Sequence, residues 1–140
     1  MSQITQGTRT WTFGYDAAGN RTSLNHPNGA KIVYTYLNNN WLGTITHKKA
    51  GGTTFDTLTY AYDANGNRTT LTDYTGTTAF GYDALNRLSS AAYPGTYGTW
   101  SWAYDAVGNR LTQNSTSGQT TYGYDANGNL TGISGGTTFT

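Results

Sequence analysis

The sequence predicts an all-β protein: an antiparallel meander of hairpins whose sheet curls or spirals. A short turn-like phrase recurs six times, and apolar residues alternate with small or polar ones before each copy, as in Trp11, Phe13 and Tyr15. The composition contains no Glu and is rich in Thr, Gly, Asn and Tyr, which favours strands and turns over helices. At 140 residues, we expect a single domain spanning residues 1–140.

The repeated phrase reads as a turn between two strands. Its fullest copy is YDANGNR at residues 62–68, where the Asp can accept hydrogen bonds from backbone N–H groups just beyond it. Three residues after the Asp position every copy has Gly or Asn, which predicts a left-handed backbone with positive φ. The predicted turns span residues 15–21, 36–42, 62–68, 82–88, 104–110 and 124–130. The structural turn residues are Tyr15, Asp16, Gly19, Tyr36, Asn40, Tyr62, Asp63, Gly66, Arg68, Tyr82, Asp83, Asn86, Arg87, Tyr104, Asp105, Gly108, Arg110, Tyr124, Asp125 and Gly128.

Aromatic rings precede every turn at two levels. One level holds the six motif tyrosines, and the other, two residues earlier, holds Phe13, Tyr34, Tyr60, Phe80, Trp102 and Tyr122. Side by side, these rings would form ladders on one face of the sheet. Because the chain has few other apolar residues, we expect the rings to form the core.

The strands after the motif turns are expected to be short and to end in a second, Gly-containing turn. Leu42, Leu88 and Leu130 stand where other copies have Arg, which we interpret as two turn lengths reconciled by a bulge. The second turns are predicted at residues 26–29, 50–52, 74–76, 94–96, 117–118 and 135–136. This pattern gives about a dozen strands, with unpaired edges near Thr8–Tyr15 and Gly136–Thr140.

Charge and cysteine content narrow the classes of partner. A net charge of +1 predicts neither a nucleic-acid face nor a polybasic membrane anchor. The chain has no Cys, so it has no disulfides or thiolate chemistry. Residues 1–7 lack the charged and apolar regions of a signal peptide, and no apolar run is long enough to span a membrane.

The motif spacing resembles the YD repeats of Rhs-type proteins. Five copies keep Tyr-Asp at a spacing of about twenty residues, from about Trp11 to the end of the chain, and four of them continue as Ala-x-Gly-Asn-Arg or Ala-x-Gly-Asn-Leu. The sixth copy, Tyr36-Leu37, keeps the Tyr and the Asn40 turn position. The family includes bacterial Rhs polymorphic toxins, the shell component of insecticidal toxin complexes and the animal teneurins. The resemblance implies a long antiparallel sheet that spirals into a hollow shell, which in the toxins encloses a C-terminal toxic domain.

The chain also departs from the family pattern. It carries only six repeats, no variable toxin domain is visible, and the Asp-Pro self-cleavage signature that closes an Rhs core is missing. Residues 137–140 are expected to be a strand entering a seventh turn. The sequence therefore resembles a segment of a shell.

From this resemblance we expect a non-catalytic scaffold that encloses or displays a toxin or effector domain. Its expected partners are other YD repeats, copies of itself through sheet edges, an enclosed effector domain or surface glycans. The resemblance implies a secreted or cell-surface protein. No catalytic residue, cofactor or metal ligand is predicted.

The motif and the two histidines also allow chemical readings other than a turn-making role. Residues 63–67 resemble half of a calcium loop, but the Gly is misplaced and no Glu follows at the twelfth position. The repeated Asp and Arg, as in Asp63 and Arg68, can be read as acid and base groups or, as we expect, as a row of surface ion pairs. His26 and His47 have no catalytic or metal-binding partner at a meaningful spacing and are interpreted as surface residues.

The rival function is a carbohydrate-binding or adhesive module. Exposed rings on a β-face, including Trp41, Trp100 and Trp102, can stack on sugars. The first and last strand-like segments are near copies of the strand before each turn, so the edges of two molecules could pair head to tail into filaments.

Overall fold

The computed structural model describes residues 2–135, and every regular element in that range except one short 3₁₀ helix is a β-strand. Strand order in the sheet follows chain order from β1 to β13, and all the pairings described are antiparallel. The predicted all-β antiparallel meander is therefore confirmed. The chain divides into two compact units, Met1–Gly76 and Thr77–Thr140. The single domain expected over residues 1–140 remains a prediction.

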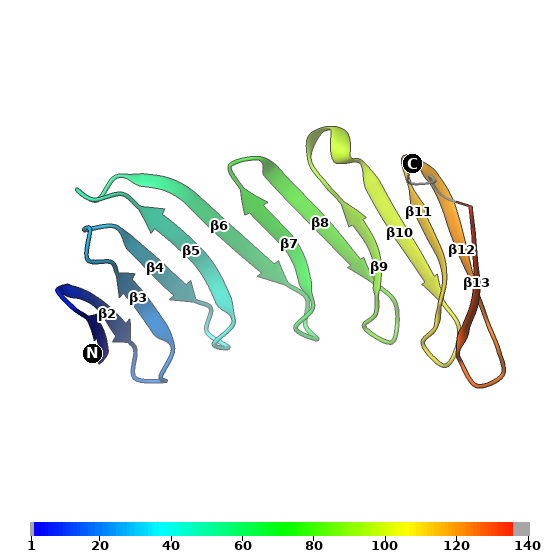
Figure 1. Cartoon of the computed structure of the whole chain (residues 1–140), viewed down its shortest axis with the longest axis horizontal. Helices are drawn as coiled ribbons and strands as arrows, with labels where there is room; N and C mark the ends of the chain where they lie inside the picture. The colour runs from blue at the N-terminus through cyan, green and yellow to red at the C-terminus, as the bar shows by residue number, and fades with distance from the viewer. Residues whose placement is uncertain (1, 136–140) are drawn as a thin grey trace. The chain divides into compact units, whose positions relative to one another are not determined.

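The first unit contains seven strands that lie side by side in chain order (Figure 1). Their bounds are β1 Ser2–Gln6, β2 Arg9–Tyr15, β3 Arg21–Asn25, β4 Lys31–Tyr36, β5 Leu42–Lys48, β6 Thr54–Tyr62 and β7 Arg68–Asp73. The three motif turns of this unit, at residues 15–21, 36–42 and 62–68, lie at the same end of its hairpins (Figure 1). The turns at residues 26–30 and 49–53 lie at the opposite end.

The second unit has the same construction with one addition. Its strands are β8 Gly76–Tyr82, β9 Leu88–Ala92, β10 Thr99–Tyr104, β11 Arg110–Ser115, β12 Gly118–Tyr124 and β13 Leu130–Gly135. A 3₁₀ helix, η1 Gly95–Tyr97, interrupts the connection between β9 and β10. The sequence predicts one of the less regular second turns here, at residues 94–96, and the structure has a longer loop that contains this helix.

A bulge lies beside the motif turn in all six copies, which corrects the expectation of two turn lengths. Tyr15 pairs with Arg21, whereas Gly14 pairs with Ser23, so Thr22 is an extra residue on the return strand. The Leu copies have the same offset, since Tyr36 pairs with Leu42. The copies that carry Leu and those that carry Arg place this residue at the same distance in sequence from the Gly or Asn position. Both kinds of copy therefore form the same type of turn, with the same bulge.

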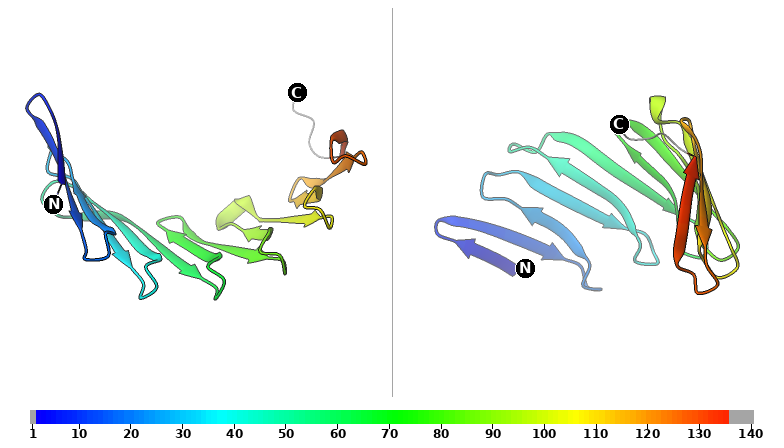
Figure 2. Two further views of the ribbon diagram at one scale, coloured as in Figure 1. Left: turned by 90° about the horizontal axis from the view of Figure 1, so that it is seen from below. Right: turned by 45° about the vertical axis from the view of Figure 1, so that its right-hand side comes forward.

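The expected core of rings is not found. Within each unit the strands form a single layer (Figure 2), and Ala91 is the only apolar side chain that is buried among the described residues. The rings do share one face, because residues paired across strands point to the same side, as Phe13 and Leu24 do. A single layer has nothing to enclose that face, so most of its rings are only half-buried.

The opposite face of the sheet carries small, polar side chains. Thr35 and Thr44 form a cross-strand hydroxyl hydrogen bond of 2.7 Å, and Asn25 donates to Thr12 over 2.9 Å. At Gly14 an added Cβ would lie against the Ser23 hydroxyl, so this face has little room for a larger side chain.

The N-terminal edge differs from the sequence prediction. A further strand, β1, pairs with β2 from Ser2 opposite Phe13 to Gln6 opposite Arg9, so the edge is Ser2–Gln6 rather than Thr8–Tyr15. All five β1 residues are exposed. The edge predicted at Gly136–Thr140, and the strand expected at residues 137–140, lie outside the described residues.

Candidate functional site

The motif turns share one set of backbone hydrogen bonds. In each copy the N–H of the Asp position donates to the carbonyl four residues on, over 2.8–3.0 Å. The N–H three residues after the Asp position donates back to its carbonyl over 2.9–3.3 Å. The copy at residues 37–41 forms both bonds although Leu37 replaces the Asp. The backbone turn therefore does not depend on the carboxylate.

The position three residues after the Asp has positive φ in all six copies, as the sequence predicts. The values are 83° at Gly19, 62° at Asn40, 87° at Gly66, 59° at Asn86, 100° at Gly108 and 78° at Gly128. Asn40 and Asn86 are the only non-Gly residues with positive φ among the described residues. Asn tolerates this conformation better than other residues that carry a Cβ.

The carboxylate is the centre of the turn in the five copies that keep Asp. In the fullest copy, Oδ1 of Asp63 accepts from the N–H groups of Asn65 and Asn67, both at 2.9 Å. Its Oδ2 accepts from the side-chain amide of Asn67 at 2.9 Å. The same Asp–Asn pairs recur as Asp16 with Asn20, Asp105 with Asn109 and Asp125 with Asn129. This is the Asx-type role predicted for the Asp, with a side-chain partner that was not predicted.

The expected row of Asp–Arg ion pairs is confirmed in one of its copies, where Nε of Arg87 lies 2.7 Å from Oδ2 of Asp83. In that copy Arg87 occupies the position that Asn occupies elsewhere, four residues after the Asp. Arg21, Arg68 and Arg110 stand one position later, where the bulge directs them onto the face that carries the rings rather than toward the carboxylate.

The arginines stack on tyrosine rings instead. The guanidinium carbon of Arg21 lies 4.6 Å from the ring centre of Tyr34, and that of Arg110 lies 4.3 Å from the ring centre of Tyr122. Arg87 lies 4.8 Å from the Tyr104 ring centre, so it binds a carboxylate and a ring at once. Cation–π contacts of this kind are attractive and also cover part of the exposed ring.

The motif tyrosines join consecutive repeats. The hydroxyl of Tyr36 donates to the carbonyl of Arg21 over 2.9 Å, and that of Tyr62 donates to the carbonyl of Leu42 over 3.0 Å. In the second unit Tyr104 donates to the carbonyl of Leu88 over 2.9 Å. Tyr124 donates to the carbonyl of Arg110 over 3.1 Å. Each acceptor is the first residue of the strand that follows the preceding motif turn, so these four bonds join equivalent positions.

Hydrogen bonds lower the pKa of the motif carboxylates. The side-chain amide of Asn20 lowers the pKa of Asp16, and those of Asn67 and Asn129 act in the same way on Asp63 and Asp125. The backbone N–H of Arg87 is the main cause of the lowered pKa of Asp83. A carboxyl that stays ionised and fully engaged in a turn is poorly suited to act as a general acid.

The two histidines lie outside the motif turns. His47 lies in β5 with its ring 5.8 Å from that of Phe55, while His26 begins the turn at residues 26–30. Within residues 2–135 no three His, Cys, Asp or Glu side chains are grouped closely enough to hold a metal ion. No helix in that range is long and apolar enough to cross a membrane.

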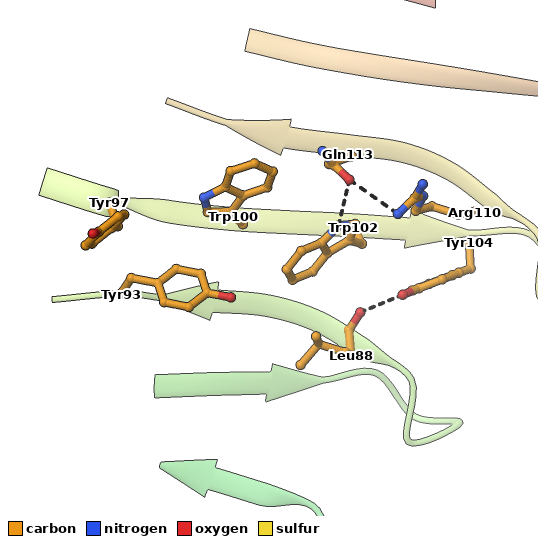
Figure 3. A pocket seen from close by; sticks show the side chains of 8 residues that line it. All are labelled: Leu88, Tyr93, Tyr97, Trp100, Trp102, Tyr104, Arg110 and Gln113. Carbon is orange, nitrogen blue, oxygen red and sulfur yellow. Dashed lines mark hydrogen bonds between the residues drawn. The ribbon is translucent and has the colours of Figure 1, made fainter. Parts of the chain in front are cut away.

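One concave site in the second unit does not belong to the repeat pattern. It is a groove of about 550 Å³ between the loop at residues 93–98 and strands β10 and β11 (Figure 3). Trp100 and Trp102 lie along it on β10. The sequence predicts Trp102 as part of the ring ladder but does not predict the groove. The sequence feature that could have indicated the groove is the pair of tyrosines, Tyr93 and Tyr97, around the predicted turn at residues 94–96.

Comparison with known proteins identifies similar chains. The sequence matches the RHS Repeat family over residues 2–31, 62–97 and 104–140, which together make up more than half of its length. No curated protein matches it.

The solved structures that resemble it belong to toxin complexes. TcdB2-TccC3 without its hypervariable C-terminal region is 19% identical, with a TM-score of 0.75 over 87% of this chain and 7% of that chain. The Photorhabdus luminescens Tc holotoxin pore with a TccC3 mutation is 19% identical, with a TM-score of 0.69 over 83% and 8%. TcdB2-TccC3-Cdc42 is 18% identical, with a TM-score of 0.70 over 84% and 8%. The chain thus shares their fold over less than a tenth of their length.

Proposed function

This chain belongs to the RHS Repeat family, and on that premise we propose that it is a non-catalytic structural scaffold. It acts as a segment of a repeat shell that encloses or displays a toxin or effector domain. The protein that contains it is secreted or carried on the cell surface, in keeping with the toxin complexes that share its fold.

The observation that carries the proposal is the hydrogen bond to the preceding repeat that four motif tyrosines make: Tyr36, Tyr62, Tyr104 and Tyr124. Tyr62 to Leu42 and Tyr104 to Leu88 join equivalent positions over 3.0 and 2.9 Å, although they lie in different units of the chain. The repeats that begin at Tyr36 and Tyr104 thus each supply a donor for the repeat before them and an acceptor for the repeat after them. A unit of this kind suits an array in which stability depends on neighbours.

A scaffold role also fits the chemistry of the carboxylates. Five nearly equivalent Asp side chains accept hydrogen bonds from their own turns, so none is singled out as a reactive group. An enzyme concentrates groups of shifted pKa at one place, and here the shifts repeat along the chain in the same direction.

A substrate screen tests the absence of catalysis. We expect no turnover of glycoside or peptide substrates by the wild-type chain or by Asp105→Asn. Asp73→Asn is the matched control, because Asp73 lies at the end of β7 and outside the motif turns. Turnover by the wild type that is lost in Asp105→Asn and kept in Asp73→Asn would overturn the scaffold proposal.

Protease protection tests the enclosing role in the full-length protein that contains these repeats. We expect an effector segment within that protein to resist protease as long as the repeats are folded. Tyr104→Ala removes the bond to Leu88 and should expose the segment to cleavage, whereas Tyr74→Ala alters a ring that is 83% exposed and should not. An effector segment cleaved equally fast in wild type and Tyr104→Ala would contradict enclosure.

A further inference from the structure

The groove in the second unit is built by a loop that the repeat does not need. The other described turns at this end of the hairpins contain no helix, whereas the β9–β10 connection contains η1 and carries Tyr93 and Tyr97. A hydrogen bond of 2.9 Å from the N–H of Tyr93 to the carbonyl of Gly98 closes the loop. Gly98 has φ of 69°, and an added Cβ there would clash with the Thr116 methyl group. The loop therefore lies in close contact with Thr116, in the turn between β11 and β12.

The rings of this groove are presented to solvent rather than packed as a core. Tyr97 is 75% exposed and Tyr93 is 40% exposed, and both tryptophans are only half-buried. Ala91 pairs with Trp100 on one side and with Phe80 on the other. Its small side chain is fully buried, whereas the rings that line the groove are not.

The two tryptophans form an oriented aromatic surface. Their ring centres lie 6.5 Å apart and their planes differ by 25°, so both rings face in nearly the same direction. The indole N–H of Trp102 donates to Oε1 of Gln113 over 3.3 Å, which holds that ring in position (Figure 3). A rigid aromatic pair costs little conformational entropy when a ligand binds to it.

Polar groups border this aromatic surface. Oε1 of Gln113 also accepts from the Arg110 guanidinium over 3.3 Å, so the amide nitrogen is the end of Gln113 that neither of these donors engages. The exposed Tyr93 and Tyr97 add phenol hydroxyls on the other side of the groove (Figure 3). An aromatic floor with a few polar groups at its border is typical of sites for small amphipathic ligands.

The charged groups that line the groove narrow the class of ligand that it can bind. Arg110 is the only ionisable group of fixed charge that lines the groove, and its guanidinium already stacks on Tyr122. A single engaged cation is too little for a nucleic acid or another polyanion, which needs a row of cations. The lining contains no carboxylate, so a cationic ligand would find no ion-pair partner there.

We infer that this groove binds a neutral oligosaccharide, a property separate from the scaffold role. A sugar ring has an apolar face of C–H groups and a border of hydroxyls, which matches an aromatic floor bordered by hydrogen-bonding groups. One ring stacks on Trp100 and the next on Trp102, while hydroxyl groups bind the Gln113 amide and the tyrosines of the loop. The groove is open at the surface, so a chain longer than two sugars can extend beyond it.

Titration of the whole chain with neutral hexasaccharides tests this inference. The panel contains cello-, chito-, xylo-, manno- and malto-hexaose, and the readouts are tryptophan fluorescence and calorimetry. We expect saturable binding of at least one of them. Trp100→Ala and Trp102→Ala should each weaken binding at least tenfold. Trp41→Ala should leave it unchanged, because Trp41 packs on Tyr62 in the first unit with ring centres 5.1 Å apart.

Two further measurements keep the test decisive. Tyr97→Ala alters an exposed side chain and should keep the fold, so it should weaken binding even where a tryptophan variant unfolds. A hexagalacturonate and a proline-rich peptide are titrated in parallel as an anionic sugar and a non-sugar ligand of aromatic grooves. The inference is overturned if no neutral hexasaccharide binds at millimolar concentration. It is also overturned if only the uronate or the peptide binds, or if Tyr97→Ala and Trp41→Ala have equal effects.

Discussion

Tyr104 donates its hydroxyl proton to the backbone carbonyl of Leu88 over 2.9 Å, across 16 residues of sequence. Replacement by Phe keeps the ring and removes only this bond, so Tyr104→Phe should destabilise the chain by about 0.5–1.5 kcal/mol. The midpoint of denaturant unfolding measures the change. Tyr97→Phe is the control, since that side chain is 75% exposed, and equal midpoints for both variants would show that the bond adds no stability.

The left-handed turn position gives a prediction that distinguishes two copies. At Gly108 an added Cβ has nothing within 4 Å, so Gly108→Asn should be mild and Gly108→Val should cost about 1–3 kcal/mol because of positive φ. At Gly66 the added Cβ would lie 3.0 Å from the Trp41 ring, so Gly66→Asn should cost more than Gly108→Asn. Melting temperatures check this order. Equal losses for Asn and Val at Gly108 would mean that backbone strain is not what selects Gly there.

Stability should fall in acid. The turn hydrogen bonds lower the pKa of the motif carboxyls below the ordinary value of about 3.9. A lowered folded pKa gives stability that is fully present above the unfolded pKa and is lost as pH drops through the folded pKa. We therefore expect unfolding midpoints to be level from about pH 7 to 5 and to decline below about pH 4.

Carboxyl-carbon NMR shifts followed through the same pH range identify the residues responsible. Asp63 and Asp125 should titrate below the ordinary range. Asn67→Ala removes the amide donor to Asp63 and should raise the pKa of Asp63 while leaving that of Asp125 in place. A titration of Asp63 that Asn67→Ala does not move would show that the amide is not the cause.

Edge pairing between molecules is the fourth prediction. All five residues of β1 are exposed, and one side of this edge strand has no hydrogen-bonding neighbour within the described chain. Unpaired strand edges favour addition of another strand. We expect association that grows with concentration in light scattering after size exclusion. Ile4→Lys should reduce it, because Ile4 is 60% exposed and a charged edge residue opposes pairing. A monomer at all concentrations would exclude this mode of assembly.

The local conformation of the motif was predictable because it depends on residues adjacent in sequence. Gly19 and Asn40 share a slot that only a left-handed conformation explains, and their φ values of 83° and 62° agree. The alternation around Trp11 and Phe13 likewise placed the rings on one face. Turn chemistry and period-two patterning are local signals, so a single sequence is sufficient to reveal them.

The features that sequence reasoning missed depend on direction in space. Asp63 and Arg68 look like an ion pair by spacing, but the bulge next to the turn sends Arg68 to the ring face and leaves Asn67 beside the carboxylate. The hydroxyl of Tyr62 finds a carbonyl 20 residues earlier, and no local pattern encodes that acceptor. The groove at Trp100 and Trp102 depends on a loop fold that its composition did not predict.

The tie between a motif tyrosine and the preceding return strand has a consequence for how such chains can change. Successive motif tyrosines are 21, 26, 20, 22 and 20 residues apart, yet the described ties join equivalent positions. Length differences are taken up away from the motif, by the bulge at Phe55 in β6 and by the loop at residues 93–98. The end of the hairpins that carries the motif turns therefore keeps a constant structure, while the opposite end accepts insertions. New recognition loops can be grafted at that free end, by evolution or by design, without disturbing the joints between repeats.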